Sequence, residues 1–421
     1  MSSEYQVHVV SKENIANHAV VSASKAALPP VDDGHVRVRT IIISLTINTQ
    51  TYARLGGVRN WWDTYPVSHD LPEPYNDRSR YGICPAWGYG EVLDSKVSGI
   101  STGELLWGFW PSSSLPVELR LVPAGVTGHW IEKSEGRQSL MNLYQRYVIA
   151  EPGLRIQSLD EAQWKEMALG AVFTVWQAGY LLNAYVFGSR STHPLGIGEW
   201  SKEDTDLSSA VVVALSASGK TARGFIHHLK HDRSSDEGPL GLLSITAARI
   251  KTFVPESSLP AKTVAYEDAT GKETMDWMIS QRPRKVVVVD FGGRGNSLYT
   301  LLGALKTNLS DVKVVVIGVG GAADALTPKD VGAWAQQTAT LENRVQMNTS
   351  GLRDTAMDRY GEEAYFNAYE NAWQSFVKSP AISDLKLEIR EGIAGDNGFE
   401  GGWTQLCEGQ VPGDVALVYR L

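Results

Sequence analysis

A short run of small residues between an apolar segment and a helix is the first place where this sequence could do chemistry. Residues 210–215 are continuously apolar, and a helical pattern begins a few residues later and continues to about Leu229. The backbone N–H groups at the start of a helix bind phosphate, assisted by the helix dipole. The segment therefore predicts a phosphate site. Its residues are Ser216, Ser218, Gly219, Lys220 and Thr221.

Two phosphate-binding motifs fit these letters. The pattern Ser-x-x-Gly-x-x-Ala over residues 216–222 is a degenerate dinucleotide turn, with small residues where the backbone approaches a pyrophosphate. The pattern Ala-x-x-x-x-Gly-Lys-Thr over residues 214–221 nearly matches a nucleoside-triphosphate loop, and Asp290 after an apolar strand would hold magnesium. However, Ala214 falls inside the apolar run, which leaves a loop too small for a triphosphate. We expect a dinucleotide and keep a nucleoside triphosphatase as a third alternative.

The next strand would lie beside the adenosine ribose. In a dinucleotide fold a carboxylate at the end of this strand favours NAD. Here the strand near residues 240–244 ends at Ser244. Thr246 and Arg249 follow it, and no carboxylate does. Hydroxyls and a guanidinium suit a 2′-phosphate. The predicted cofactor is therefore NADPH, and the alternative is that Arg249 is an ordinary solvated helix residue.

Aromatic residues are concentrated between residues 61 and 110. Large rings with few charges suit a flat or lipophilic substrate, because desolvating it against the rings gives most of the affinity. The alternative is that these rings form an ordinary core. The substrate-binding candidates are Trp61, Trp62, Tyr65, Trp87 and Tyr89, and Trp107 and Trp110 belong to the same concentration.

No metal site is expected. The two cysteines, Cys84 and Cys407, are far apart, which excludes disulfide frameworks and structural zinc. His227 and His231 have the spacing of two ligands on one helix face. They lie at the far end of the helix that follows the phosphate turn, and we expect a solvated helix end there.

The pattern of strands and helices changes along the chain. Residues 1–125 contain short strands and almost no helical periodicity, and an irregular loop over residues 54–81 is typical of a functional segment. Residues 159–182 are helical. From residue 210 onward helices alternate with continuous Val, Ile and Leu runs, as in a parallel sheet that is buried on both faces. The fold class is therefore α/β.

Composition narrows the functional classes. The chain has 421 residues, of which 43% are hydrophobic and 20% charged, as in ordinary globular proteins of two or three domains. A net charge of −8 disfavours nucleic acid as a partner. No apolar run resembles a signal peptide or a membrane span, so a cytoplasmic location is expected.

Several weak motifs occur in the order of a known superfamily. They are residues 32–38 (an opening Gly-x-Val strand), 45–56 (an active-site loop), 97–108 (a Gly-rich turn), 173–178 (a helix leading to the cofactor domain), 290–293 with 317–320 (strand ends) and 407–418 (a closing strand). The chain resembles the medium-chain dehydrogenase/reductase superfamily, on its zinc-free, quinone-reductase-like side, in a divergent branch of unknown function. Residues 85–90, Pro-Ala-Trp-Gly-Tyr-Gly, replace the usual Gly-His-Glu, so metal-assisted alcohol oxidation is not expected.

The resemblance implies two domains and assigns site residues. It implies a mainly β, GroES-like substrate domain over 1–164 and 380–421, and a Rossmann-like cofactor domain over 165–379. It implies that Tyr52 donates a proton and Asn48 holds the substrate carbonyl, although Tyr52 could equally be a packed core residue. It also places a set of residues near the nicotinamide. They are Gly292, Gly293, Gly318 and Val319, framed by Arg294 and by Thr174 on the substrate side.

The expected function is therefore reduction by NADPH, without zinc, of an activated C=C or C=O bond. The substrate would be a small lipophilic molecule such as an enone, a quinone or a polyketide-like compound. The alternative is that the degenerate turn has lost its dinucleotide and the fold acts as a cofactor-independent lyase, cyclase or isomerase, or as a binding protein. No membrane partner is expected, and a homodimer would agree with the superfamily.

Overall fold

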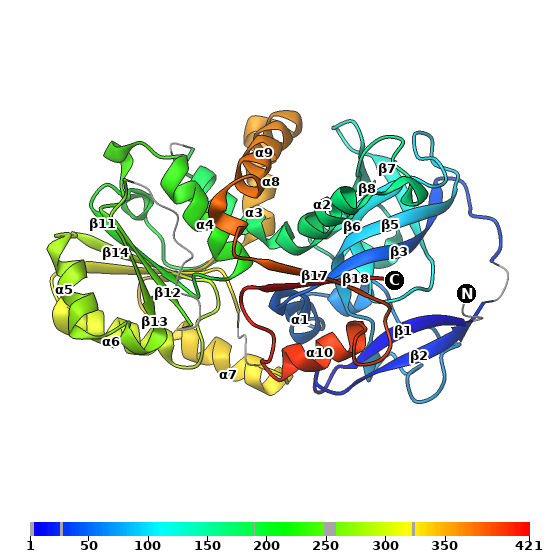
Figure 1. The fold of residues 1–421 in the computed structure, drawn as a ribbon, viewed down its shortest axis with the longest axis horizontal. Helices are drawn as coiled ribbons and strands as arrows, with labels where there is room; N and C mark the ends of the chain where they lie inside the picture. Colours follow the sequence, from blue (N-terminus) through cyan, green and yellow to red (C-terminus); the bar gives the residue numbers. More distant parts are fainter. Residues whose placement is uncertain (1–3, 26–27, 189, 248–257, 322–324) are drawn as a thin grey trace. The chain divides into compact units, whose positions relative to one another are not determined.

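The computed structural model describes residues 4–25, 28–188, 190–247, 258–321 and 325–421, which form two compact units (Figure 1). Unit 1 comprises Met1–Thr174, Ala325–Gly332 and Lys386–Leu421. Unit 2 comprises Val175–Asp324 and Ala333–Leu385. These bounds differ from the expected 1–164 with 380–421 and 165–379. The difference at residues 165–174 arises because helix α2 (Glu161–Val172) packs on strands of unit 1.

Unit 1 is built on an eight-stranded sheet that closes on itself. Strand β7, the last in the order, also pairs with β3. The strands that close into a barrel are therefore β3, β5, β6, β9, β8 and β7. A smaller sheet joins β2 (His18–Ser24), β1 (Glu4–Ser11) and β4 (Tyr81–Gly82). The order of the large sheet is β17 (Lys386–Glu391), β18 (Val415–Arg420), β3 (His35–Leu45), β5 (Pro85–Ser95), β6 (Leu105–Pro111), β9 (Arg146–Ile149), β8 (His129–Glu132) and β7 (Val117–Pro123).

A single residue, Thr46, separates the end of β3 from the start of helix α1 (Ile47–Arg54). The Thr46 hydroxyl accepts the Thr49 N–H at 3.2 Å, and the Thr49 hydroxyl accepts the Thr46 N–H at 3.1 Å. This reciprocal capping box satisfies two N–H groups at the start of the helix, which explains why it begins there. The segment expected as an active-site loop is thus partly helical, and Asn48 and Tyr52 lie one turn apart on α1.

Unit 2 contains a seven-stranded sheet in which all strands except β10 run parallel. From β11 the chain adds β12 and β13 on one side and β14 to β16 on the other, which is the strand order of dinucleotide-binding folds. The strands are β10 (Ile197–Gly198), β16 (Arg344–Gln346), β15 (Lys313–Gly318), β14 (Lys285–Asp290), β11 (Ala210–Leu215), β12 (Gly241–Thr246) and β13 (Ala261–Ala265).

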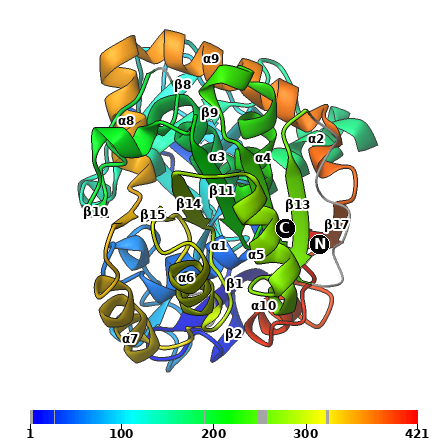
Figure 2. The same cartoon turned by 90° about the vertical axis from the view of Figure 1, so that its left-hand side faces the viewer.

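Helices α5 (Lys272–Ser280) and α6 (Ser297–Asn308) cover one face of this sheet (Figure 2). Their apolar residues pack against buried valines of β11 and β14. The expected fold class, a Rossmann-like sheet beside a mainly β domain, is confirmed. The remaining helices are α3 (Trp176–Leu181), α4 (Lys220–His231), α7 (Pro328–Ala339), α8 (Thr349–Tyr360), α9 (Glu362–Val377) and, in unit 1, α10 (Phe399–Cys407).

Membrane-crossing helices are absent from the described part of the chain, where no helix combines the length and the apolar character that a span needs.

The hairpin of β1 and β2 docks on α10 through two histidines. His8 is fully buried, and its Nε2 lies 3.0 Å from Nδ1 of His18, whose Nε2 lies 3.0 Å from the Thr404 hydroxyl. Trp403 of α10 donates its indole N–H to the Ile15 carbonyl at 2.8 Å. Burial, and secondly the neighbouring His18, hold the pKa of His8 well below its ordinary value. His8 is therefore neutral in the folded chain.

Gly88→Ala tests whether the barrel needs the close approach of β3 and β5 at Gly88. A Cβ at Gly88 would lie 1.9 Å from the Ile42 carbonyl oxygen, so β3 and β5 must separate. We expect the free energy of unfolding, measured in urea, to fall by about 1–3 kcal/mol or more. Gly57→Ala is the control, because nothing lies within 4 Å of a Cβ there. Equal stability of both variants would contradict this account.

His8 should make stability depend on pH. Its folded pKa is lowered, so below about pH 6.5 the unfolded chain binds a proton that the folded chain does not. The free energy of unfolding should therefore fall as the pH drops below about 6.5, by up to about 1.4 kcal/mol per pH unit from this group. His8→Gln should make the pH slope shallower, whereas His69→Gln, at an exposed position, should leave it unchanged. An unaltered slope in His8→Gln would refute the assignment.

Candidate functional site

The side chain of Tyr52 is buried in unit 1 and hydrogen-bonded through its hydroxyl. It is 3% exposed, and its hydroxyl oxygen accepts a hydrogen bond from Asn48 Nδ2 at 2.5 Å and from Trp87 Nε1 at 2.7 Å. A phenol oxygen accepts two hydrogen bonds and donates one. Both acceptor positions of Tyr52 are therefore filled, and its proton remains to be donated.

Aromatic rings enclose this hydroxyl. The Tyr52 ring meets Trp61, Phe109 and Tyr144 edge to face, with centroids 4.9, 4.8 and 5.7 Å apart. Trp87 stacks on Trp107 at 4.9 Å. Burial raises the pKa of Tyr52, while the hydrogen bonds from Trp87 and Asn48 oppose that rise.

This arrangement suits a proton donor. Low polarity keeps the phenol protonated at neutral pH, and the two donors on its oxygen stabilise negative charge if the proton leaves. The structure thus brings together four sequence-predicted residues, Tyr52, Asn48, Trp61 and Trp87. The resemblance placed Tyr52 and Asn48 in one loop, whereas Trp87 comes from a strand more than thirty residues further along the chain.

The other predicted substrate-binding residues lie elsewhere in unit 1. Trp62 packs where Gly56 and Gly82 leave room, since a Cβ at either glycine would lie 2.4 or 2.2 Å from its ring. Trp61 and Trp62 are consecutive in a 3-10 turn, so their side chains point in different directions. The structure therefore gives Trp62 a packing role.

Tyr89 and Thr174 lie near helix α2. A Cβ at Gly170 would approach the Tyr89 hydroxyl within 2.5 Å, and the Thr174 hydroxyl donates to the Gly170 carbonyl at 3.1 Å. A hydroxyl bonded to the carbonyl four residues earlier is a common way to satisfy a helical threonine.

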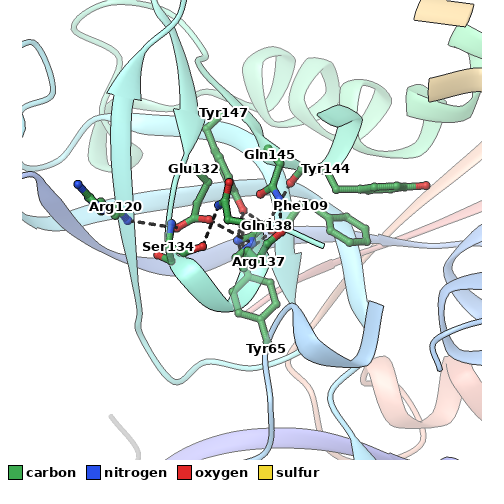
Figure 3. Close-up of polar contacts among 10 residues, drawn as sticks. All are labelled: Tyr65, Phe109, Arg120, Glu132, Ser134, Arg137, Gln138, Tyr144, Gln145 and Tyr147. Carbon is green, nitrogen blue, oxygen red and sulfur yellow. Dashed lines mark hydrogen bonds and ion pairs between the residues drawn. The ribbon is translucent and has the colours of Figure 1, made fainter. Parts of the chain in front are cut away.

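Tyr65 belongs to a buried cluster around Arg137 (Figure 3). Arg137 Nη1 donates to the hydroxyls of Tyr147 at 2.9 Å and Tyr65 at 3.3 Å, and its Nε lies 3.6 Å from a carboxylate oxygen of Glu132. Arg137 is 5% exposed and Glu132 is fully buried. Arg137 Nη2 also donates to the main-chain carbonyl of Tyr144 at 2.9 Å. The cluster thus fixes the turn that presents the Tyr144 ring to Tyr52.

Sequence reasoning missed Tyr144, Phe109 and Arg137. Tyr144 lies in a short 3-10 turn (Asn142–Gln145) between strands, with no motif around it. Phe109 reads as an ordinary strand residue, and Arg137 as a solvated charge. No spacing in the sequence indicates that these residues meet.

In unit 2 the phosphate turn is short and strained. Strand β11 ends at Leu215 and α4 begins at Lys220, so only residues 216–219 connect them. Ser216 has φ +66°, in the left-handed region. Gly219 caps α4 without any side-chain hydrogen bond. The N-cap residue therefore supplies no side-chain acceptor to the N–H groups of the first turn of α4, which includes Thr221.

The triphosphate interpretation does not fit this geometry. Ala214 is buried within β11, so the loop cannot begin there. The carboxylate of Asp290 accepts the N–H groups of Gly292 at 3.0 Å and Gly293 at 2.7 Å. Burial raises the pKa of this carboxyl. Asp290 therefore ties its own turn together through Oδ1.

Unpartnered hydroxyls lie at the end of β12. Ser244 and Thr246 are buried, and no described residue is hydrogen-bonded to either hydroxyl. Buried polar atoms without partners are uncommon, and a bound ligand is one explanation. Ser216 and Asp290 lie within electrostatic reach of Tyr266, which places Tyr266 beside the phosphate turn. Arg249, predicted to bind the 2′-phosphate, lies outside the described residues.

The ends of β14 to β16 carry a further cationic side chain. A Cβ at Gly318 would lie 2.3 Å from the Gln346 side chain and 2.4 Å from the Arg344 guanidinium, so Gly318 gives room to these two side chains. Val319 donates its N–H to the Asp290 carbonyl at 2.8 Å. Arg344 donates to Gln346 at 2.5 Å, and its Nε has no hydrogen-bond partner among the residues that the structure describes. The sequence analysis did not identify Arg344.

The expected solvated helix end is correct for His231, which is exposed, and wrong for His227. His227 and His228 are buried, and His228 Nδ1 lies 2.6 Å from the Asp232 carboxylate. The strongly amphipathic α4 turns these rings toward Trp176 and Phe376. Within the described residues, no group of three or more histidines, cysteines, aspartates or glutamates is arranged to hold a metal ion.

Three solved structures share this fold. One is the mitochondrial 2-enoyl thioester reductase Etr1p/Etr2p heterodimer from Candida tropicalis, with TM-score 0.56, 10% identity, and 99% of this chain and 100% of that chain covered. Another is the Etr1p complex with NADP and crotonyl-CoA (TM-score 0.55, 10% identity, 99% and 100% covered). A third is CurA from Vibrio vulnificus in complex with NADPH, with TM-score 0.50, 11% identity, and 99% of this chain and 98% of that chain covered. They confirm the fold that the superfamily resemblance implies.

Sequence comparison gives a family without an activity. A family model described as "Protein of unknown function (DUF2855)" matches residues 43–412. No curated protein matches the sequence. These findings agree with the divergent branch of unknown function that the motifs resemble.

Arg137→Met tests the buried cluster. The change leaves the Glu132 carboxylate buried without its guanidinium partner, so we expect the free energy of unfolding in urea to fall by about 3–5 kcal/mol. The double variant Arg137→Met with Glu132→Gln removes the uncompensated charge and should regain part of the loss. A double variant that is less stable than the single variant would show that charge pairing is not what holds this turn.

Proposed function

This chain belongs to the DUF2855 family, whose function is unknown, and we propose that it is an NADPH-dependent oxidoreductase that reduces an activated double bond in a small lipophilic molecule. The observation that carries the proposal is the buried Tyr52 hydroxyl, which two donors hold within an aromatic enclosure. The dinucleotide strand order of unit 2 supports it. Neighbours described as enoyl reductases make C=C the first bond to test.

The residues of unit 2 fit a dinucleotide. The turn Ser216–Gly219 and the start of α4, including Ser218, Lys220 and Thr221, would hold the pyrophosphate. The unpartnered hydroxyls of Ser244 and Thr246 would lie on the ribose side. Arg249 would pair with the 2′-phosphate, and Gly292, Gly293, Gly318 and Val319 would border the nicotinamide at the carboxyl ends of β14 and β15. Bound NADPH supplies a hydride.

Unit 1 would supply the remaining steps. Asn48 Nδ2 uses one N–H for Tyr52, and its second N–H can donate to the substrate carbonyl oxygen, where negative charge develops. Tyr52 gives its proton to the carbanion that hydride addition creates. The rings of Trp61 and Trp87 exclude water and contact the lipophilic part of the substrate. Trp62, Tyr65, Tyr89 and Thr174 are not needed for these steps. The cytoplasmic location and the homodimer stay predictions.

Cofactor binding is the first test. Titration calorimetry with NADPH and NADH should show at least about tenfold tighter binding of NADPH, and Arg249→Ala should weaken NADPH binding by about 10–100-fold with little effect on NADH. Arg284→Ala is the matched control, because Arg284 is exposed and precedes β14, at the amino-terminal end of that strand. Failure to bind either nucleotide would overturn the proposal and favour cofactor-independent chemistry.

Tyr52→Phe tests the proton donor. With NADPH and an acceptor panel of crotonyl-CoA, 2-cyclohexenone and 1,4-benzoquinone, we expect the variant to lose about 10²–10⁴-fold in kcat while the Kd for NADPH is unchanged. Tyr75→Phe, which removes a hydroxyl from the loop outside the aromatic enclosure, should retain wild-type rates. Normal turnover by Tyr52→Phe would exclude it as the donor.

A further inference from the structure

We propose that Arg223 is a positioning residue for the cofactor, which holds the phosphate turn in the shape that receives a pyrophosphate by tying it to the segment before β17. The inference rests on the proposed function, in which residues 216–219 and the start of α4 bind the pyrophosphate. Arg223 lies three residues after the start of α4, and its side chain is fully buried. It therefore acts on a ligand only through the residues that it holds.

The guanidinium of Arg223 joins two segments of unit 2 that are far apart in the sequence. Its Nε donates to the Ser218 carbonyl at 2.9 Å. Its Nη1 donates to the Ala381 carbonyl at 2.9 Å and to one carboxylate oxygen of Asp384 at 2.5 Å, and its Nη2 donates to the other oxygen at 2.9 Å. The 3-10 turn that carries Ala381 (Pro380–Ile382) lies beside α4 (Figure 1).

The bond to Ser218 fixes one peptide plane of the phosphate turn. The Ser218 carbonyl and the Gly219 N–H belong to the same planar trans peptide and point in opposite directions. Arg223 holds the carbonyl, and the Gly219 N–H donates to the Ser216 carbonyl at 3.1 Å. The plane is therefore held from both sides. It directly precedes the first turn of α4, whose N–H groups would face the pyrophosphate, so its orientation sets the direction in which α4 begins.

The phosphate turn requires such support because its first residue is strained. Ser216 has φ +66°, and a residue other than glycine stays in this region only where surrounding contacts hold it. One contact is the hydrogen bond from the Ala217 N–H to the Ile245 carbonyl of β12, at 2.9 Å. The bond from Arg223 holds the other end of the turn, at Ser218.

Packing alone does not explain an arginine at this position. Burying an ion pair costs desolvation, and apolar side chains of similar volume often fill such a space without loss of stability. A guanidinium differs because its planar fork donates to several acceptors in fixed directions. Burial acts to raise the pKa of Asp384, but the bonds and charge of Arg223 outweigh it and lower that pKa. Asp384 is therefore ionised and balances the guanidinium that holds the turn.

Arg223→Lys tests the inference, because lysine keeps a positive charge beside Asp384 but lacks the planar fork. We expect the Kd values for NADPH and NADH to rise equally, by about tenfold, since both cofactors carry the pyrophosphate. The Kd for adenosine 2′-monophosphate, which has no pyrophosphate, should stay unchanged. A general loosening of unit 2 would weaken all three ligands together and would overturn the inference.

Arg233→Lys is the matched control. Arg233 follows the carboxyl end of α4 and also joins separate segments, because it donates to the carbonyls of Phe187 at 2.9 Å and Glu237 at 3.0 Å. Neither of these residues belongs to the phosphate turn. Thermal unfolding should show a loss of stability in both variants, whereas calorimetry should show weaker NADPH binding in Arg223→Lys alone. Equal NADPH affinity in the two variants would contradict the positioning role.

Asp384→Asn provides a second test in case Arg223→Lys folds poorly, because the Asp384 side chain is 29% exposed. Asparagine keeps the shape but removes the charge that holds the guanidinium, so the Kd for NADPH should rise at least about threefold. Wild-type affinity in this variant would refute the inference. If the wild-type protein binds NADPH but reduces no acceptor, the proposed reduction fails and the positioning role stands. If it binds neither NADPH nor NADH, both fail.

Discussion

The hydrogen bond from the Trp87 indole to Tyr52 joins the two parts of unit 1 that the candidate site requires. Trp87 lies on β5, in the wall of the barrel, and Tyr52 lies on α1, just after β3. An indole N–H can only donate, so the phenol must accept, and this directionality leaves its own proton for another group. Unpairing these buried groups would cost about 1–3 kcal/mol. The site geometry is therefore coupled to the stability of the barrel.

Much of the fold could be predicted because its signals are local. The apolar runs of β11 and β14 are buried on both faces, as are the last four residues of β15, and each run is recognisable from composition alone. The phosphate turn could be predicted because small residues precede a helical pattern. The Asn48–Tyr52 pair was placed by the resemblance in a single short segment, and the spacing of four residues puts both on one side of α1.

The rest depends on contacts between distant segments. Trp61 and Trp62 look alike in the sequence, yet one contacts Tyr52 and the other fills the space beside two glycines. Arg137 reads as a surface charge until Glu132 and three tyrosines are seen around it. Asp290 has the sequence context of a magnesium ligand, but one oxygen of its carboxylate accepts two backbone N–H groups of its own turn. In each case the partner, and not the residue type, decides the role.

The burial of Cys84 has a consequence for chemical resistance. Enones and quinones alkylate thiolates, so an enzyme that handles such electrophiles risks modifying itself. Cys84 is fully buried beside α1, and burial raises the pKa of its thiol; burial also raises the pKa of Cys407 to about 11. Both thiols stay protonated and weakly nucleophilic at neutral pH. Under the proposed function, a reactive acceptor would therefore meet no activated thiolate on this chain.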